Sequence, residues 1–164
     1  MISTNSDVLA KQLMELQTRV EQKLTKMVLG FSYEFSMRAI ANTPLGDSRV
    51  FASWYKNRPY GLPEEEGIAK GNWQFSTSDN FQLQLVSGQN SGTEALDLMA
   101  SHYTSYSLGQ PIYIGNAAPY INMLEKNHSP QTGGRGIMAP TIDDIKGAFA
   151  VDLQSLYNLS LIHI

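Results

Sequence analysis

Apolar residues recur near the start of the chain at intervals of three or four positions, which is the spacing of one face of an α-helix. The series consists of Leu9, Leu13, Leu16, Val20, Leu24, Met27, Phe31 and Phe35. It predicts one long helix over residues 6–41, capped by Ser6 or Asp7 and stopped at residues 42–44, Asn-Thr-Pro. At 1.5 Å per residue this helix would be roughly 50 Å long, longer than a domain of this size is wide. Part of its apolar stripe must therefore contact something outside its own domain.

Gly30 leaves two forms of this helix open, because a glycine inside a helical pattern weakens it. In one form the chain breaks at Gly30 into two ordinary helices that pack on one core. In the other the helix continues, and one half projects and packs on neighbouring subunits.

Short alternating segments further along the chain predict a small sheet. Trp73 and Phe75 alternate on one strand, residues 83–85 continue the alternation on a second, and residues 77–80 supply the turn between them. Residues 111–115 are expected to join this hairpin as a third strand.

Two further helices are expected beside the sheet. The first begins near Ser91, at capping-box spacing from Glu94, and ends at Gly109. The last begins at Thr141. Together these elements predict an α+β fold: a small antiparallel sheet of about three strands packed against helices, with a long N-terminal helix and a C-terminal helix.

The chain length of 164 residues suits a single domain spanning residues 1–164. Residues 71–164 form its expected sheet-and-helix core, and residues 43–70 form an irregular, aromatic-rich loop. Trp54 and Tyr55 in this loop either cap the core or contribute to an interface, and the sequence favours neither interpretation.

Charge and cysteine content exclude several classes of protein. The net charge is −3, and no cluster of Lys and Arg is present that would neutralise a nucleic-acid backbone. Cysteine is absent, which excludes disulfides and thiolate metal sites and fits assembly in a reducing cytoplasm. Charged residues make up only 16% of the chain, so the surface is less solvated than usual and suits burial against other subunits.

The polar residues form no catalytic constellation. Glu125 and His128 have the spacing of a carboxylate–imidazole metal pair on one helix face, but a metal site would require a second pair. Residues 133–136, Gly-Gly-Arg-Gly, lack the lysine and the preceding strand of a phosphate-binding loop. We therefore expect a protein that is not an enzyme and uses no cofactor or metal. A metal-dependent hydrolase based on Glu125 and His128 is the alternative from another class.

Residues 116–140 are more typical of an interaction loop. Tyr120 offers an amphipathic ring, and Arg135 offers a cation at the tip of a Gly-rich loop. Glu125 is expected to hold that loop by accepting hydrogen bonds from its backbone amides. The expected contact residues are Tyr120, Glu125, Arg135, Met138, Trp54 and Tyr55.

Several residues of different chemical type recur here in a characteristic order. They are Tyr113, Ile114, Asn116, Pro119, Tyr120, Leu124, Glu125, Ser129, Gln131, Gly136 and Met138. An earlier element, Gly-Asn-Trp-Gln, occupies residues 71–74. In this order and spacing, residues 65–155 resemble the neck and tail-completion proteins of long-tailed bacteriophages. The chain departs from the family pattern at residues 127–128, Asn-His, and at residues 133–135, which lengthen the loop.

The resemblance implies a viral structural protein of the phage head-to-tail junction, located in the virion. Copies would form a cyclic ring, sixfold or twelvefold, around the DNA channel, and would contact head-closure, connector and tail-tube proteins. DNA would pass through the lumen without specific binding. A tail terminator ring is the close alternative, and a DNA-binding module is a third hypothesis that the acidic balance disfavours.

Overall fold

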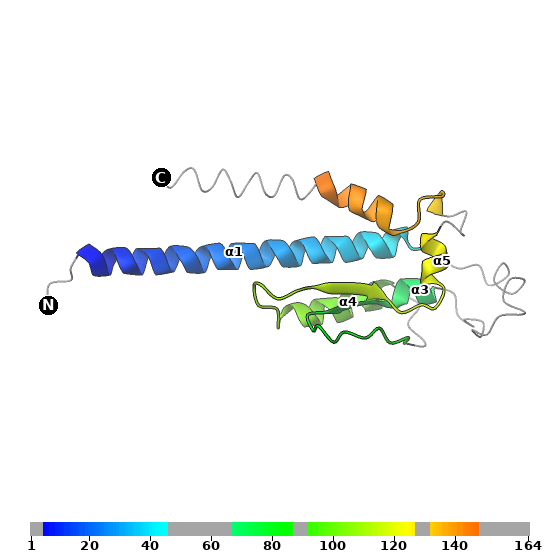
Figure 1. Ribbon diagram of the computed structural model, residues 1–164, viewed down its shortest axis with the longest axis horizontal. Coiled ribbons are helices and arrows are strands. Elements are labelled where there is room, and N and C mark those ends of the chain that lie inside the picture. Colours follow the sequence, from blue (N-terminus) through cyan, green and yellow to red (C-terminus); the bar gives the residue numbers. More distant parts are fainter. Residues whose placement is uncertain (1–4, 46–66, 87–91, 127–131, 148–164) are drawn as a thin grey trace, which may run out of the picture.

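The computed structural model describes residues 5–45, 67–86, 92–126 and 132–147, and one helix extends along most of the length of this part (Figure 1). This helix, α1, spans Asn5–Asn42 without interruption over 38 residues. Gly30 is exposed and does not break it, so the alternative of two separate helices is wrong. The predicted bounds of 6–41 are confirmed to within one residue at each end.

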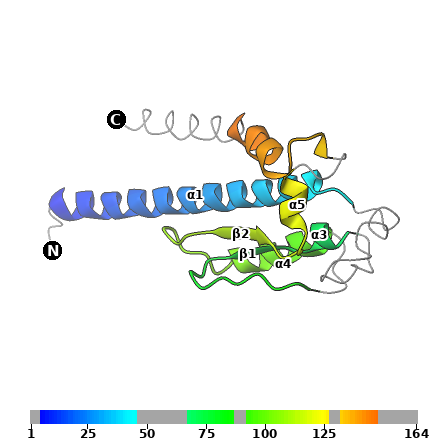
Figure 2. The same cartoon turned by 45° about the vertical axis from the view of Figure 1, so that its right-hand side comes forward.

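The remaining elements lie beside the C-terminal half of α1, so that its N-terminal half extends beyond them (Figure 1). After α1 come α3 (Ile68–Gly71), β1 (Trp73–Ser76), α4 (Gly92–Tyr103), β2 (Tyr113–Asn116) and α5 (Ile121–Glu125). Residues 138–147 are also helical. They lie on the opposite side of α1 from the two strands, as both views show (Figures 1 and 2).

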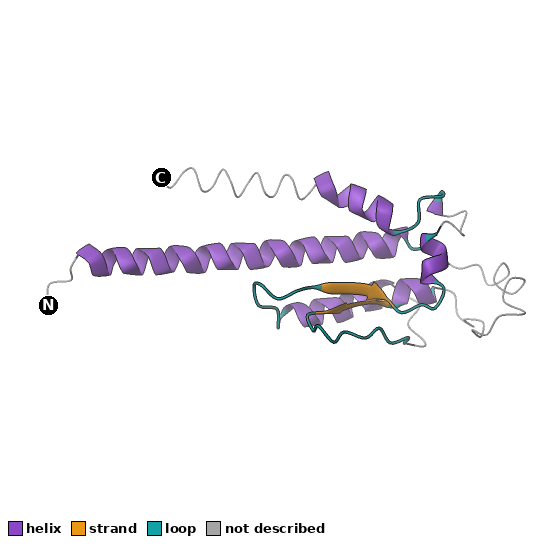
Figure 3. Cartoon of the chain, in the orientation of Figure 1, coloured by secondary structure: helices purple, strands orange, loops and turns teal. Residues whose placement is uncertain are grey.

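The sheet contains two strands in the described residues, β1 and β2, and they pair antiparallel (Figure 3). The register places Trp73 opposite Asn116 and Phe75 opposite Ile114. Trp73 and Phe75 are each 5% exposed, because the alternation of β1 turns both side chains into the core. The α+β architecture with a long N-terminal helix is therefore confirmed, whereas the expected third strand is not.

Residues 81–86 follow β1 without forming the strand that their alternation predicted. Two side-chain amides hydrogen-bond to the backbone of this segment, in place of strand-to-strand backbone bonds. The Nδ2 atom of Asn72 donates to the carbonyl oxygen of Val86 (3.2 Å), and its Oδ1 atom accepts from the backbone amide of Val86 (2.8 Å). Gln74 binds the carbonyl and the amide of Gln84 in the same way. Because these side chains stand between the two segments, the backbones lie too far apart for strand pairing.

The core lies between α4, the sheet and the C-terminal end of α1. Its most deeply buried apolar side chains include Met99 of α4, Ala39 of α1 and Ile137, each at most 1% exposed. Gly92 begins α4 directly against Ile40, where a Cβ atom would overlap the isoleucine side chain. α4 ends at Tyr103, six residues before the predicted end, and the chain then turns through Gly109 at a φ of 95°.

Candidate interaction surface

The expected interaction loop begins with a buried asparagine at the end of β2. Asn116 donates from Nδ2 to the carbonyl oxygen of Ala69 (2.6 Å) and accepts through Oδ1 from the amide of Ala118 (2.9 Å). Because Asn116 is only 8% exposed, both bonds lie in the interior, where their loss is costly. They fix the turn between β2 and α5 against α3.

Tyr120, expected to be a contact residue, lies inside the subunit. It is 8% exposed and packs in the same core as Leu124 of α5. The amphipathic character of a tyrosine ring suits both a contact surface and a core boundary, and α5 turns this ring inward.

Glu125 anchors the start of the last helix. Its Oε2 atom accepts hydrogen bonds from the backbone amides of Ile137 (2.9 Å) and Met138 (3.0 Å). These amides are among the donors that the first turn of a helix leaves unpaired, and a carboxylate there also suits the helix dipole. Glu125 was expected to hold the Gly-rich loop through the amides of the loop itself, whereas the two amides bound here are those that immediately follow the Gly-rich run.

The last helix therefore begins three residues before the predicted start at Thr141. Thr141 is fully buried and its hydroxyl donates to the carbonyl oxygen of Ile137 (2.7 Å), a bond within the helical turn. The side chain of Asn42 donates to the same hydroxyl oxygen (3.1 Å). The acceptor for the first amides of the last helix is thus Glu125, twelve residues earlier in the chain than Ile137.

Gly136 lets the chain pass close to Glu125. Its φ is 71°, a conformation that favours glycine, and a Cβ atom there would lie 2.5 Å from the backbone oxygen of Glu125. Gly134 has a φ of 80°, but a Cβ atom at that position would meet no heavy atom within 4 Å. Of these two glycines, only Gly136 is thus restricted by both its conformation and its neighbours.

Arg135 is the one expected contact residue, among those that the structure describes, with a predominantly exposed side chain. It is 58% exposed and forms an ion pair with Asp143 (2.5 Å), whose second oxygen lies 3.5 Å from Lys146. Met138 is half-buried against the core, and Glu125 is also partly buried. Trp54, Tyr55 and His128 lie outside the described residues.

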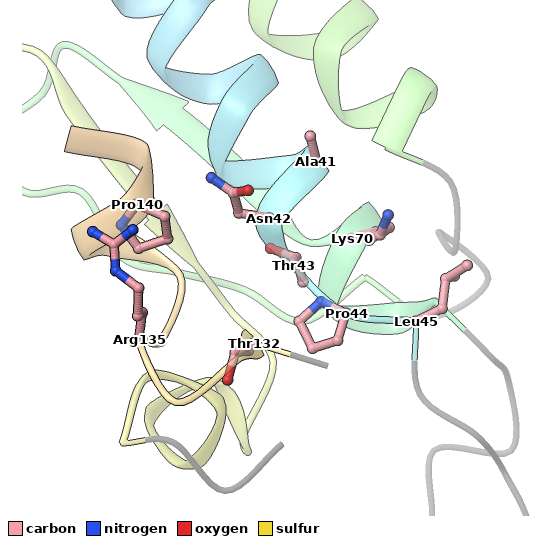
Figure 4. Close-up of a pocket in the computed structure, with 10 residues that line it drawn as sticks. Ala41, Asn42, Thr43, Pro44, Leu45, Lys70, Thr132, Arg135 and Pro140 are labelled. Atoms are coloured by element: carbon pink, nitrogen blue, oxygen red, sulfur yellow. The ribbon is translucent and has the colours of Figure 1, made fainter. Parts of the chain in front are cut away.

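A pocket of about 600 Å³ opens beside Arg135 at the end of α1 (Figure 4). Arg135 and Lys70 lie on opposite sides of it, with Pro44 between them (Figure 4). Thr43 also lines it, but its hydroxyl donates to Ala39 (2.6 Å) and accepts from Trp73 (2.9 Å). Among the described residues that line it are two cations and neither a histidine nor a carboxylate. The pocket therefore suits contact with a polar or acidic group better than acid–base chemistry.

The stripe on α1 is exposed along the half of the helix that extends beyond the other elements. Leu9, Leu13 and Leu16 are each more than 50% exposed, and Val20 is 46% exposed. Apolar side chains in one continuous row on a helix mark a surface that contacts another protein. The prediction that part of the stripe lacks a partner in its own domain is confirmed for the described residues.

A second apolar surface, which the sequence did not reveal, adjoins this stripe. It is a groove of about 400 Å³ between α1 and β2. The lining residues are Val28, Phe31, Ser32, Phe35, Gln110, Ile112 and Ile114. The alternation around Tyr113 marked an apolar strand face in the sequence, but no local signal indicated that α1 lies across from it.

The described residues contain no group of three or more His, Asp or Glu side chains arranged to hold a metal ion. No described helix combines the length and apolar content needed to cross a membrane. Comparisons of the chain with protein-family models, with curated proteins and with solved structures found no match.

Proposed function

We propose that the protein is a structural subunit of the head-to-tail junction of a long-tailed bacteriophage, a neck or tail-completion protein that joins tail to head. The exposed stripe on α1 carries the assembly part of this proposal, because Leu9, Leu13 and Leu16 are each more than half exposed in the single subunit. Such a protein acts by assembly and has no turnover.

The residues that carry the resemblance support the phage part of the proposal. Asn72 and Gln74 bind a neighbouring segment to β1, and Asn116 fixes the turn after β2. Glu125 anchors the last helix next to Gly136. These contacts join segments that are distant in sequence. Several of the residues that match the family pattern thus have a structural role in this chain, which supports the proposal.

In the proposed assembly, copies form a closed ring of sixfold or twelvefold symmetry around the DNA channel. Arg135 and the pocket beside it belong to the surface that contacts an adjoining ring, and Trp54 and Tyr55 are further proposed contact residues. The net charge of −3 suits a lumen through which DNA passes without specific binding. A tail terminator would share this ring arrangement and is the close alternative.

The metal-dependent hydrolase is less well supported. The Oε2 atom of Glu125 already accepts two backbone hydrogen bonds, so metal binding there would compete with the start of the last helix. Metal analysis of the purified protein distinguishes the two functions, since stoichiometric zinc, iron or manganese would favour the hydrolase.

The location of the chain in phage particles tests the proposal. Phage particles encoded by a genome that carries this coding sequence are purified, the chain is sought in them by mass spectrometry, and antibody-labelled particles are imaged by electron microscopy. We expect label at the junction between head and tail. Particles that contain the chain only in the capsid shell or the distal tail, or that lack it, would refute the proposed function.

A further inference from the structure

We propose that the N-terminal half of α1 from one copy docks in the groove between α1 and β2 of the next copy. Residues 5–26 are called the arm. The inference rests on the proposed assembly role for the identity of the partner, which is a second copy of this chain. It adds the site at which each copy contacts the next.

The stripe on α1 has a strict repeat of 11 residues. Two series show it: the first is Leu9, Val20 and Phe31, and the second is Leu13, Leu24 and Phe35. An 11-residue repeat gives 3.67 residues per turn, close to the 3.6 of a straight helix, so the row drifts little around α1. The exposed row on the arm is therefore in line with the two phenylalanines that line the groove.

The groove has the chemistry that the arm needs in a partner. α1 contributes Phe31 and Phe35 to one wall, and β2 with the residue before it contributes Ile114 and Ile112 to the other. Figure 2 shows β2 between α1 and β1, so β2 is the strand that faces α1 across the groove. Of the described residues that line it, the polar ones are Ser32 and Gln110, and neither is charged. When the apolar row of the arm lies in this groove, both walls of the groove cover it. When the apolar rows of two arms pack against each other, each row is covered on one side only and buries less apolar surface.

Charge also favours a contact between the arm and the body of another copy over a contact between two arms. The arm contains four basic residues, Lys11, Arg19, Lys23 and Lys26, and three acidic residues, Asp7, Glu15 and Glu21. Of the 12 basic and 15 acidic residues in the whole chain, eight basic and twelve acidic residues therefore remain outside the arm. The arm has a net charge of +1 and the remainder of the chain −4, so an arm is attracted overall to the body of another copy, whereas two arms of net charge +1 are not attracted to each other.

The proposed contact is heterologous, because two different surfaces of the same chain meet. A contact of this kind repeats from copy to copy and closes into a ring when the rotation between copies allows it. An arm-to-arm contact would instead pair two copies and leave both grooves open. The inference thus predicts which pairs of positions on different copies are adjacent.

Cysteine cross-linking tests this prediction without background, because the chain has no cysteine of its own. One batch carries Ile112→Cys in the groove. Four other batches carry a single cysteine on the arm, at Leu9, Leu13, Leu16 or Val20. Each arm batch is mixed with the groove batch, oxidised, and analysed by non-reducing electrophoresis and mass spectrometry. Leu98→Cys replaces the arm variants in the control, because Leu98 of α4 is 51% exposed, the same fraction as Leu16.

We expect a disulfide between the groove cysteine and at least one arm cysteine, at a yield at least tenfold above that of the Leu98→Cys control. A dominant disulfide between two arm cysteines would overturn the inference in favour of arm-to-arm pairing. The absence of any cross-link above the control would overturn it as well. Label at the head-to-tail junction is measured separately, so failure of the contact and failure of the proposed function are distinguishable.

Discussion

The indole nitrogen of Trp73 donates a hydrogen bond to the hydroxyl oxygen of Thr43 across 2.9 Å, in the buried space where α1 ends against β1. Thr43 is fully buried, and its hydroxyl in turn donates to the carbonyl oxygen of Ala39 (2.6 Å). This chain of bonds joins the last turn of α1 to the first residue of the sheet. It therefore fixes the direction in which the rest of α1 leaves the core.

Substitution of Thr43 tests this connection. Thr43→Val keeps the shape of the side chain but leaves the indole N–H unpaired, which should cost about 1–3 kcal/mol of unfolding free energy. Thr43→Ser keeps the hydroxyl and loses one methyl group, a cost of about 0.8 kcal/mol. Urea unfolding should therefore rank Thr43→Val as the less stable variant, although valine is the closer match in shape. The reverse order would contradict the assigned bond.

Glu125 should be more important to stability than its place on a short helix suggests. Glu125→Ala leaves the amides of Ile137 and Met138 without their acceptor, so we expect a loss of about 1–3 kcal/mol in thermal or urea unfolding. Glu125→Gln retains one acceptor oxygen and should lose less. Glu15→Ala on the exposed part of α1 is the control, with an expected change within about 0.5 kcal/mol. Equal effects at Glu125 and Glu15 would refute the anchoring role.

Gly134 and Gly136 form a matched pair for the close approach of the loop to Glu125. Both have positive φ, so alanine at either position should cost about 1–2 kcal/mol from the backbone alone. At Gly136 the added methyl also meets the backbone oxygen of Glu125. Gly136→Ala should thus be clearly less stable than Gly134→Ala in parallel unfolding curves. Matching curves would show that the loop moves away from Glu125 without cost.

Tyr103 makes stability depend on pH above 10. Its hydroxyl is buried and lacks a hydrogen-bond partner among the described residues, and its ring lies edge-on to Phe75 with the centroids 4.9 Å apart. Burial raises the pKa of Tyr103 to about 12 from the ordinary 10.0, and the Ser36 hydroxyl, which donates its own hydrogen bond to the carbonyl oxygen of Ser32 and does not reach hydrogen-bond geometry with Tyr103, offsets part of this rise. Because the folded state holds the proton more tightly, this contribution to stability is complete below pH 10 and is lost between pH 10 and 12.

Tyr103→Phe removes this titration together with the unpaired hydroxyl. At pH 7 we expect the variant to be as stable as the wild type or slightly more so, because phenylalanine requires no partner. Between pH 10 and 12 its unfolding free energy should fall less steeply than that of the wild type. Urea unfolding at several pH values measures both slopes, and identical slopes would contradict the effect of burial.

The sequence predicted the features that depend on local spacing. The run from Leu9 to Phe35 predicted α1 almost to its ends, because an apolar period of this length is typical of a helix and of little else. Glu125 was correctly expected to accept backbone hydrogen bonds near the Gly-rich loop, but the donors are the amides of Ile137 and Met138, which follow the glycines.

The sequence could not predict the features that depend on contacts between distant residues. Alternation around Leu83 and Leu85 suggested a strand, but the side chains of Asn72 and Gln74 take the bonds that a ladder would use. The groove forms because Ile112 lies opposite the face of α1 that carries Phe31. The residue spacing within α1 or within residues 110–114 does not indicate that these two segments lie next to each other.

Sedimentation of the wild type and of the double variant Leu13→Asp with Leu16→Asp tests the central claim, that the stripe on α1 joins copies of this chain. Both leucines are more than half exposed, so the subunit itself should fold normally, as circular dichroism checks. Leu98→Asp provides the control for an exposed helical leucine elsewhere. We predict a concentration-dependent oligomer for the wild type and for Leu98→Asp, and a monomer for the double variant. A wild type that remains monomeric at all concentrations, or a double variant that assembles as the wild type does, would contradict the account.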